Sequence, residues 1–398
     1  MLEYQVRSSV ANLEEYEVET IDAKIVVNAN ESNYPLPVEV QEAITEATKD
    51  FAFNRYPPMK AENLCAAIAR ELQVDPASVK IGNGSSELLQ QVCYAFGGPG
   101  RKIMVPYPSF SMYMEYAELA DSIPVKYPLT EEGYVDPDLV IEMCRKELPA
   151  LLIVCNPNNP TGNYNSLAAM EKIIANVKCP VVMDEAYMEF ADGKEVPPND
   201  LRPLNKMWLV AGSTLGLLPK YNNLMVFKTF SKAYGMAGLR CGYAVGSLAV
   251  IRQLGKALLP YHVNAFTLMA AKAVYEHKEL YKERLKEIKA QRELLRSNFE
   301  RLGFRVYPSA TNFIMVRPEG ETAQKLAALY YRDNDRNLEV QAAAGTVVFR
   351  YYLKNSILLR DFTKHPVLQG ALRITVGMPE ENKEILSKLN ELCLEAGI

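Results

Sequence analysis

The chain has 398 residues, and its hydrophobic content of 48% and charged content of 23% are ordinary values for a folded globular protein. A formal net charge of −4 and a pI near 5.7 argue against a nucleic-acid-binding surface. No apolar run approaches membrane-spanning length, and the first residues lack a signal-peptide pattern. We therefore expect a cytoplasmic protein with no nucleic-acid or membrane partner.

The N-terminal part is expected to be an arm with one short strand near residues 24–27 and one helix that begins near Pro37. From residue 78 the pattern becomes strand, turn and helix, repeated. Several apolar runs lack polar alternation, which is typical of strands buried on both faces, and they lie at residues 79–81, 102–106, 150–155, 180–183 and 224–227. Their alternation with helical segments predicts an α/β fold with a mostly parallel central sheet.

Residues 272–303 are highly charged but keep a helical apolar stripe, which predicts one long linking helix. Short strands and helices follow, and they predict a smaller α+β domain that also holds the N-terminal arm. The predicted division is 1–48 for the arm and part of the small domain, 49–288 for the large domain and 289–398 for the small domain. Residues 191–222 and 331–352 have weak patterns and are interpreted as insertions.

The seven cysteines are scattered without CxxC pairs, and several lie in apolar runs, such as Cys155 in LLIVC. This predicts buried free thiols in a reducing compartment. Neither a disulfide framework nor a metal site is expected.

The stretch VFKTFSKAYGMAGLR places Lys232 between apolar residues and glycines. A buried lysine has a lowered pKa and is an uncharged amine nucleophile at neutral pH, which a Schiff base with a carbonyl cofactor requires. Thr229, Ser231 and Arg240 beside it suit a phosphate monoester. Taken alone, the same stretch also fits a solvated lysine in a surface loop.

Other polar residues follow the predicted strands, and open parallel sheets bind ligands outside the carboxyl ends of their strands. Ser85 and Ser86, in GNGSSE, suit an anion site at a helix start, although a plain N-cap has the same sequence. Phe110 either stacks on a flat ring or belongs to the core. NPNNPTG is a more specific signal than these, because its prolines make a rigid turn that leaves Asn159 as a fixed hydrogen-bond donor.

Three charged residues are further candidates. Asp184, in DEAY, ends a buried strand, where a carboxylate needs a cationic partner: a protonated ring nitrogen or an ordinary lysine or arginine. Arg373, in ALRITVG, suits bidentate binding of a carboxylate or phosphate, and Arg360, in ILLRDF, is a second candidate. A surface ion pair is the alternative for each arginine.

Taken together, NPNNPTG, DEAY, TFSKAYGMAGLR and LRITVG resemble, in this order, the fold-type I pyridoxal-phosphate aminotransferases of class I and II. Within that class, NANE, NRYP, GNGSSELL, PSFSMY, and PSATNF with LRITVGMPEEN are most similar to histidinol-phosphate aminotransferases. The resemblance covers nearly the whole chain. It implies pyridoxal 5′-phosphate as cofactor and a homodimer with shared active sites. It also implies that an amino group moves between histidinol phosphate, or a similar amino acid, and 2-oxoglutarate by a ping-pong Schiff-base mechanism.

The resemblance also implies a role for each candidate residue. Lys232 would carry the cofactor and move the α-proton, and Asp184 would pair with the pyridinium nitrogen. Asn159 and Tyr187 would hydrogen-bond the ring 3′ oxygen, and Phe110 would stack on the ring. The cofactor phosphate would be held by Ser85, Ser86, Thr229, Ser231 and Arg240, with Tyr56 reaching it from the other subunit. The substrate would be held by Arg373, assisted by Arg360 and Tyr16.

Some stretches depart from the family pattern. Ser86 stands where GNGSDE has aspartate, Ser32 and Asn33 change NENPYG, and EEYEVE stands in place of PYxPG. These changes touch the substrate side or the periphery, so they leave the substrate more open than the chemistry. Aromatic amino acid aminotransferase and threonine-phosphate decarboxylase therefore remain alternatives on the same fold. A ligand sensor in a transcription regulator would carry an N-terminal helix-turn-helix domain, for which the sequence before the core is short and not basic.

Overall fold

The computed structural model describes residues 6–11, 13, 21–49, 51–191, 196, 212–334 and 337–398. Its largest element is a seven-stranded sheet with the order β2-β8-β7-β6-β5-β3-β4. The strands are β2 (Val79–Gly82), β3 (Lys102–Tyr107), β4 (Ile123–Pro128), β5 (Leu151–Cys155), β6 (Val181–Asp184), β7 (Leu224–Thr229) and β8 (Gly242–Gly246). Strands β4, β3, β5, β6 and β7 run parallel, whereas β8 pairs antiparallel with β7 and β2. The predicted mostly parallel sheet is confirmed.

Helices cover both faces of this sheet, which explains why its strands are apolar without alternation. One face packs against α4 (Ser85–Phe96), α5 (Met112–Leu119) and α8 (Leu248–Ala257). The other face packs against α3 (Glu62–Leu72), α6 (Pro137–Glu147), α7 (Leu167–Asn176) and α9 (Ala265–Glu276).

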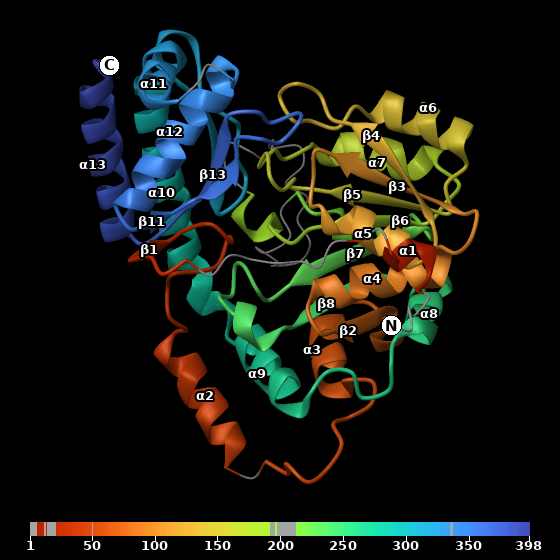
Figure 1. Cartoon of the computed structure of the whole chain (residues 1–398). Coiled ribbons are helices and arrows are strands. Elements are labelled where there is room, and N and C mark those ends of the chain that lie inside the picture. The colour runs from red at the N-terminus through yellow and green to blue at the C-terminus, as the bar shows by residue number, and fades with distance from the viewer. Residues whose placement is uncertain are drawn as a thin grey trace, which may run out of the picture.

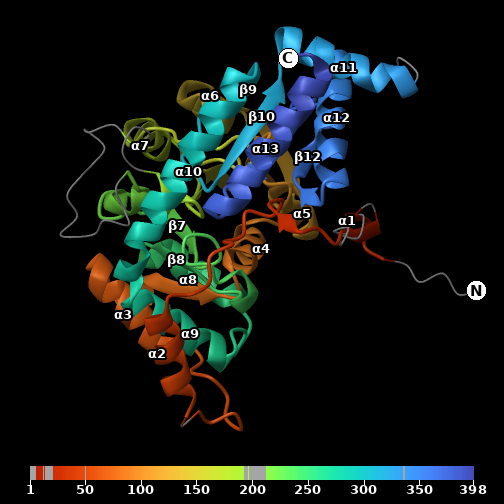
Figure 2. The same ribbon diagram turned by 90° about the vertical axis from the view of Figure 1, so that its left-hand side faces the viewer.

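The C-terminal part forms a second unit beside the large sheet (Figure 1). Its antiparallel sheet has the order β12-β13-β10-β9, with β9 (Phe304–Val306), β10 (Phe313–Pro318), β12 (Arg360–Phe362) and β13 (Ala371–Thr375). Figure 2 shows the helices gathered against it: α10 (Lys282–Arg301), α11 (Gly320–Asp333), α12 (Val340–Lys354) and α13 (Pro379–Ala396).

The N-terminal arm joins this C-terminal unit. Strand β1 (Ile25–Val26) pairs in parallel with β11 (Ile357–Leu358), and the Thr375 N–H donates to the Val27 carbonyl. Helices α1 (Ser8–Ala11) and α2 (Val38–Thr48) lie on either side of this strand in the chain. The predicted small α+β domain built from both termini is confirmed, while its boundaries at residues 48 and 288 stay a prediction.

One sequence interpretation of the C-terminal half is wrong. Residues 272–303 are not one helix, because α9 ends at Glu276 and a short 3₁₀ turn, Lys278–Tyr281, precedes α10. The turn buries Tyr281, whose ring packs edge-on against Tyr234. Within 331–352, where the sequence pattern is weak, α12 is a regular helix with a buried face, and the interpretation of this segment as an insertion stays a prediction.

The weak sequence pattern of α12 has a packing reason. Its buried face is made largely of Ala342, Ala343, Ala344 and Gly345, which give little hydrophobic signal. A Cβ at Gly345 would lie 2.4 Å from the Gly370 carbonyl oxygen, so only glycine permits this close approach. Most of the other interpreted insertion, 191–222, lies outside the described residues, and Thr214–Leu217 near its end forms a 3₁₀ turn.

All seven cysteines are buried free thiols, as predicted. In the part of the chain that the structure describes, no helix combines the length and the apolar character needed to cross a membrane.

A buried ion cluster links residues at the ends of β6 and β7. Lys228 Nζ lies 2.9 Å from Glu189 Oε1 and 3.6 Å from Glu185 Oε2, and all three side chains are buried. Glu185 also accepts hydrogen bonds from the Ser213 hydroxyl and from the N–H and hydroxyl of Thr214. The cluster therefore ties the segments on both sides of residues 192–211 to the sheet.

We predict that Lys228→Met lowers the free energy of unfolding by about 3–5 kcal/mol, because it leaves two buried carboxylates without their cation. Urea denaturation at neutral pH measures this loss. Lys220→Met is the matched control, since Lys220 Nζ lies 2.9 Å from Glu171 but its side chain is 57% exposed. This variant should lower the free energy of unfolding by less than about 1 kcal/mol. Equal losses in the two variants would contradict the prediction.

Candidate active site

A cavity of about 740 Å³ lies where β3, β5, β6 and β7 end, a volume typical of small-molecule sites. It is lined by side chains from the seven-stranded sheet, the C-terminal sheet and the N-terminal arm. All the predicted site residues line it except Tyr56 and Tyr16. The convergence follows from the topology, because parallel strands place their carboxyl ends at one edge.

Lys232 follows β7 and enters this cavity. Its Nζ donates a hydrogen bond to the Ala29 carbonyl, at 2.9 Å. Burial, and secondly the nearby Arg373 guanidinium, lowers the pKa of Lys232 to about 7. The side chain is therefore an amine that is substantially uncharged at neutral pH, as a nucleophile for a carbonyl carbon must be.

Asp184 lies at the end of β6 and is 4% exposed. Its Oδ2 accepts a hydrogen bond from the Tyr113 hydroxyl at 2.7 Å, and its Oδ1 accepts one from the Ala186 N–H at 3.1 Å. Burial raises the pKa of Asp184 to about 6, and the bond from Tyr113 opposes that rise. A cation placed in the cavity would favour the carboxylate form.

Tyr113 is a site residue that the sequence reasoning missed. It lies in the first turn of α5, whereas Phe110 lies just before that helix, and the two rings pack edge to face with centroids 5.5 Å apart. The aromatic spacing in PSFSMY was therefore the available signal, but it is equally typical of a helix core.

Hydrogen bonds to residues of the arm and between side chains fix the orientations of Tyr187, Asn159 and Arg373. The Asn30 side-chain amide donates to Tyr187 Oη at 3.0 Å, which leaves the Tyr187 O–H free to act as a donor. Arg373 Nη1 donates to Asn159 Oδ1 and its Nη2 donates to the Asn28 carbonyl, each at 2.6 Å. Because a guanidinium only donates, the Asn159 amide is oriented with its N–H₂ as the remaining donor.

The site therefore has three further residues to which the sequence alone assigned no role: Asn28, Ala29 and Asn30. They belong to the arm, and Asn30 adopts a left-handed φ of 56°. An asparagine tolerates this conformation better than most residues. Burial raises the pKa of Tyr187 to about 12, against the effect of Arg373, so its phenol stays protonated.

The predicted phosphate residues form a cradle at the start of α4. The N-cap of α4 is Gly84, so the alternative of Ser85 or Ser86 as a plain N-cap is wrong. Thr229 Oγ1 lies 3.0 Å from Ser231 Oγ. A Cβ at Gly84, which has a φ of 81°, would lie 2.6 Å from Arg240 Nη2, so glycine lets the arginine approach the helix start. Hydroxyls, a guanidinium and a helix N-terminus together suit a phosphate.

Three predicted residues lie at the edge of this arrangement or outside it. Arg360 on β12 is paired in register with Arg373 on β13 and lines the cavity. Tyr56 is 81% exposed and stacks on Tyr261 with ring centroids 4.7 Å apart, so its predicted contact with a second subunit stays a prediction. Tyr16 lies outside the described residues.

The chain belongs to the aminotransferase class I and II family, whose model matches residues 22–389. It is thus a transaminase with the predicted fold-type I architecture. It is 34% identical to histidinol-phosphate aminotransferase of Thermoanaerobacter pseudethanolicus over 395 residues, which cover 99% of this chain and 100% of that protein.

Solved structures agree on the fold. Histidinol-phosphate aminotransferase from Sinorhizobium meliloti, in complex with pyridoxal-5′-phosphate, aligns with a TM-score of 0.80 at 22% identity over 98% of both chains. L-threonine-O-3-phosphate decarboxylase from Porphyromonas gingivalis aligns with a TM-score of 0.71 at 22% identity, over 93% of this chain and 99% of that one.

The residues present fit pyridoxal 5′-phosphate, the cofactor that the family implies. One cavity holds an uncharged amine at Lys232, a buried carboxylate at Asp184 and a phosphate cradle around Arg240. These are the groups that an aldehyde, a ring nitrogen and a phosphate require.

We predict that pyridoxal 5′-phosphate attaches to the cofactor-free protein faster as the pH rises between about 6 and 8, because only the neutral Lys232 amine reacts. The rate should level off above that range, measured by the visible absorbance of the attached cofactor. Arg373→Met removes a neighbouring cation, which should raise the pKa of Lys232 and move the midpoint to higher pH. A rate still climbing at the ordinary pKa of a lysine contradicts the prediction.

We also predict that Tyr113→Phe weakens cofactor binding about 10- to 100-fold, the effect of losing a hydrogen bond to a charged group. The loss should be larger at pH 6 than at pH 8, because without this bond the pKa of Asp184 rises further. Fluorescence titration measures the dissociation constant. Tyr127→Phe is the matched control, since Tyr127 is equally buried but donates to the Ile153 carbonyl. Identical affinities for both variants would rule out the role.

Proposed function

We propose that this transaminase uses pyridoxal 5′-phosphate to move an amino group between histidinol phosphate, or a similar amino acid, and 2-oxoglutarate. The observation that carries the proposal is the meeting of Lys232, Asp184 and Arg373 in one cavity with the phosphate cradle. The 34% identity to a histidinol-phosphate aminotransferase over the whole chain supports the choice of substrate.

The cofactor, when bound, supplies an aldehyde and an electron-accepting ring. Lys232 would hold the cofactor covalently, and its free Nζ would act as the base that takes the α-proton of the amino substrate. Asp184 would pair with the ring nitrogen, Asn159 and Tyr187 would donate to the ring 3′ oxygen, and Phe110 would stack on the ring.

Arg373, with Arg360 beside it, binds the anionic end of each substrate in turn. Both substrates therefore use the same cavity, which fits a ping-pong sequence in which the keto product leaves before the second substrate enters. Arg373 and Lys232 line the same cavity, so a substrate bound through Arg373 would have its α-carbon within that cavity and accessible to Lys232 Nζ.

We further propose a cytoplasmic homodimer with shared sites. Tyr56 and Phe53 are 81% and 79% exposed on one loop, and a group of exposed aromatic side chains is typical of a protein–protein contact surface. In the dimer Tyr56 would reach the phosphate cradle of the other subunit.

A substrate panel tests the proposal. The purified protein, loaded with pyridoxal 5′-phosphate, is given histidinol phosphate, phenylalanine or tyrosine with 2-oxoglutarate, and separately threonine phosphate with detection of carbon dioxide. We expect the highest kcat/KM with histidinol phosphate, parallel double-reciprocal lines, and no turnover by Lys232→Ala. A preference for the aromatic amino acids, or carbon dioxide from threonine phosphate, would favour the respective alternative and overturn this substrate assignment.

A further inference from the structure

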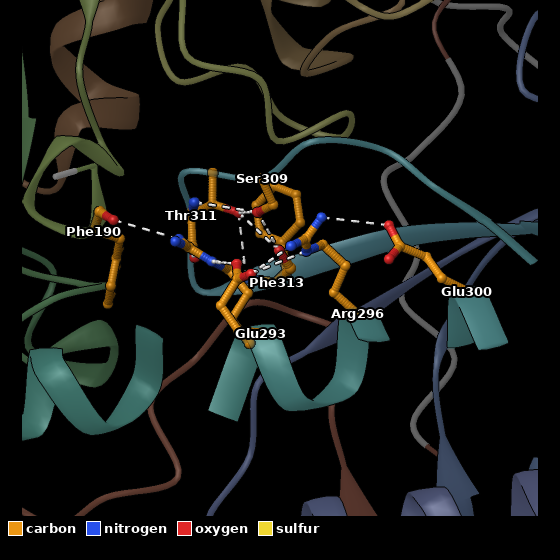
Figure 3. Close-up of polar contacts among 8 residues, drawn as sticks. Phe190, Glu293, Arg296, Glu300, Ser309, Thr311 and Phe313 are labelled. Atoms are coloured by element: carbon orange, nitrogen blue, oxygen red, sulfur yellow. Dashed lines mark hydrogen bonds and ion pairs between the residues drawn. The ribbon is translucent and has the colours of Figure 1, made fainter. Parts of the chain in front are cut away.

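Arg292 is a large, charged side chain on α10 that is only 1% exposed. Its Nη1 donates to the Thr311 carbonyl at 2.9 Å and to the Phe190 carbonyl at 3.3 Å. Figure 3 shows Phe190 and Thr311 facing each other above α10, which carries Glu293 and Arg296. One guanidinium thus joins the segment after β6 to the segment before β10.

The segment before β10, residues 309–313, is a turn held rigidly by its own side chains. The Ser309 and Thr311 hydroxyls both donate to the Phe313 carbonyl, at 2.5 and 3.1 Å. The Ala310 N–H donates to the carbonyl of Gly162, in the turn that carries Asn159. The 309–313 turn is therefore internally hydrogen-bonded and contacts the turn that carries Asn159, which lines the cavity.

The same turn reaches two groups of the site directly. The Asn312 side-chain amide donates to the Asn30 carbonyl at 3.1 Å, and Asn30 in turn donates to Tyr187 Oη. The Phe313 ring packs edge-on against Tyr187, with centroids 5.3 Å apart, and lies 5.3 Å from the Arg373 guanidinium. The position of the turn therefore sets the positions of the phenol and of the substrate-binding arginine.

We propose that Arg292 is a positioning residue for the transamination: it locks the 309–313 turn to the Phe190 segment and so fixes Tyr187 and Arg373. The inference rests on the proposed function, because it concerns the same cavity. The guanidinium is suited to this task, because the two hydrogens of its planar Nη1 point in fixed directions, one toward each carbonyl, whereas the three hydrogens of an ammonium rotate freely.

The test compares Arg292→Met with Arg296→Met, in the full-length protein loaded with pyridoxal 5′-phosphate. Arg296 is the matched control: it lies one turn further along α10 and binds Glu293 and Glu300, and its side chain is 38% exposed. We expect Arg292→Met to lower kcat/KM about 10- to 100-fold, the effect of a small misplacement of reacting groups. The KM for both substrates should rise, and the pH midpoint of the cofactor absorbance should shift, because Tyr187 faces the ring oxygen.

Arg296→Met is expected to match the wild type in all of these readouts. Arg292→Lys keeps the charge but not the planar Nη1 geometry, so it should recover only part of kcat/KM and show a shifted midpoint. This variant provides the test if Arg292→Met does not fold. A lower melting temperature with unchanged KM and absorbance midpoint would reduce Arg292 to a structural role and overturn the inference. Failure of the wild type itself to bind the cofactor would instead mark the failure of the proposed function.

Discussion

The site depends on the burial of two ionisable groups at the edge where the parallel strands end. Burial acts on them in opposite directions, lowering the pKa of Lys232 to about 7 and raising that of Asp184 to about 6. The lysine becomes a usable nucleophile, and the carboxylate becomes responsive to any cation that enters the cavity. If the two side chains were exposed to solvent, both pKa values would stay near those of an ordinary lysine and aspartate. The exclusion of water at this edge therefore gives the two groups their reactivity.

The pleat of β6 explains how the fold tolerates so much buried charge. Successive side chains on a strand point to opposite faces. Asp184 therefore faces the cavity, where Tyr113 binds it, and Glu185 faces the buried Lys228 on the neighbouring β7. Each carboxylate has its own partner. Of the two acids in DEAY, Asp184 therefore belongs to the candidate site and Glu185 to the buried ion cluster.

The sequence could predict those parts of the site that follow directly after their own strand. Lys232, Asp184 and Asn159 belong to this group, since parallel strands bring their ends together without further information. The contacts of Tyr113 and Asn30 could not be predicted, because their partners are 71 and 157 residues away in the chain. Asn30 belongs to NANE, which resembles the family, but nothing in that motif indicates a bond to Tyr187, and a buried tyrosine such as Tyr113 has no distinctive pattern. Helix α12 was missed for a related reason: small residues that pack closely give a weak apolar signal.

The cavity consists of two parts with different origins in the chain. The cofactor part, from Ser85 to Arg240, comes from one continuous run of strands and helices. The part proposed to bind the substrate joins the arm to the C-terminal unit. Arg373 on β13 contacts Asn28, and Glu381 on α13 contacts Asn33, 345 and 348 residues away in the chain. The arm also reaches the part proposed to hold the cofactor, because the Ala29 carbonyl accepts from Lys232 and the Asn30 amide donates to Tyr187. The arm therefore links the two parts of the cavity, and a change at Asn28, Ala29 or Asn30 is expected to affect both.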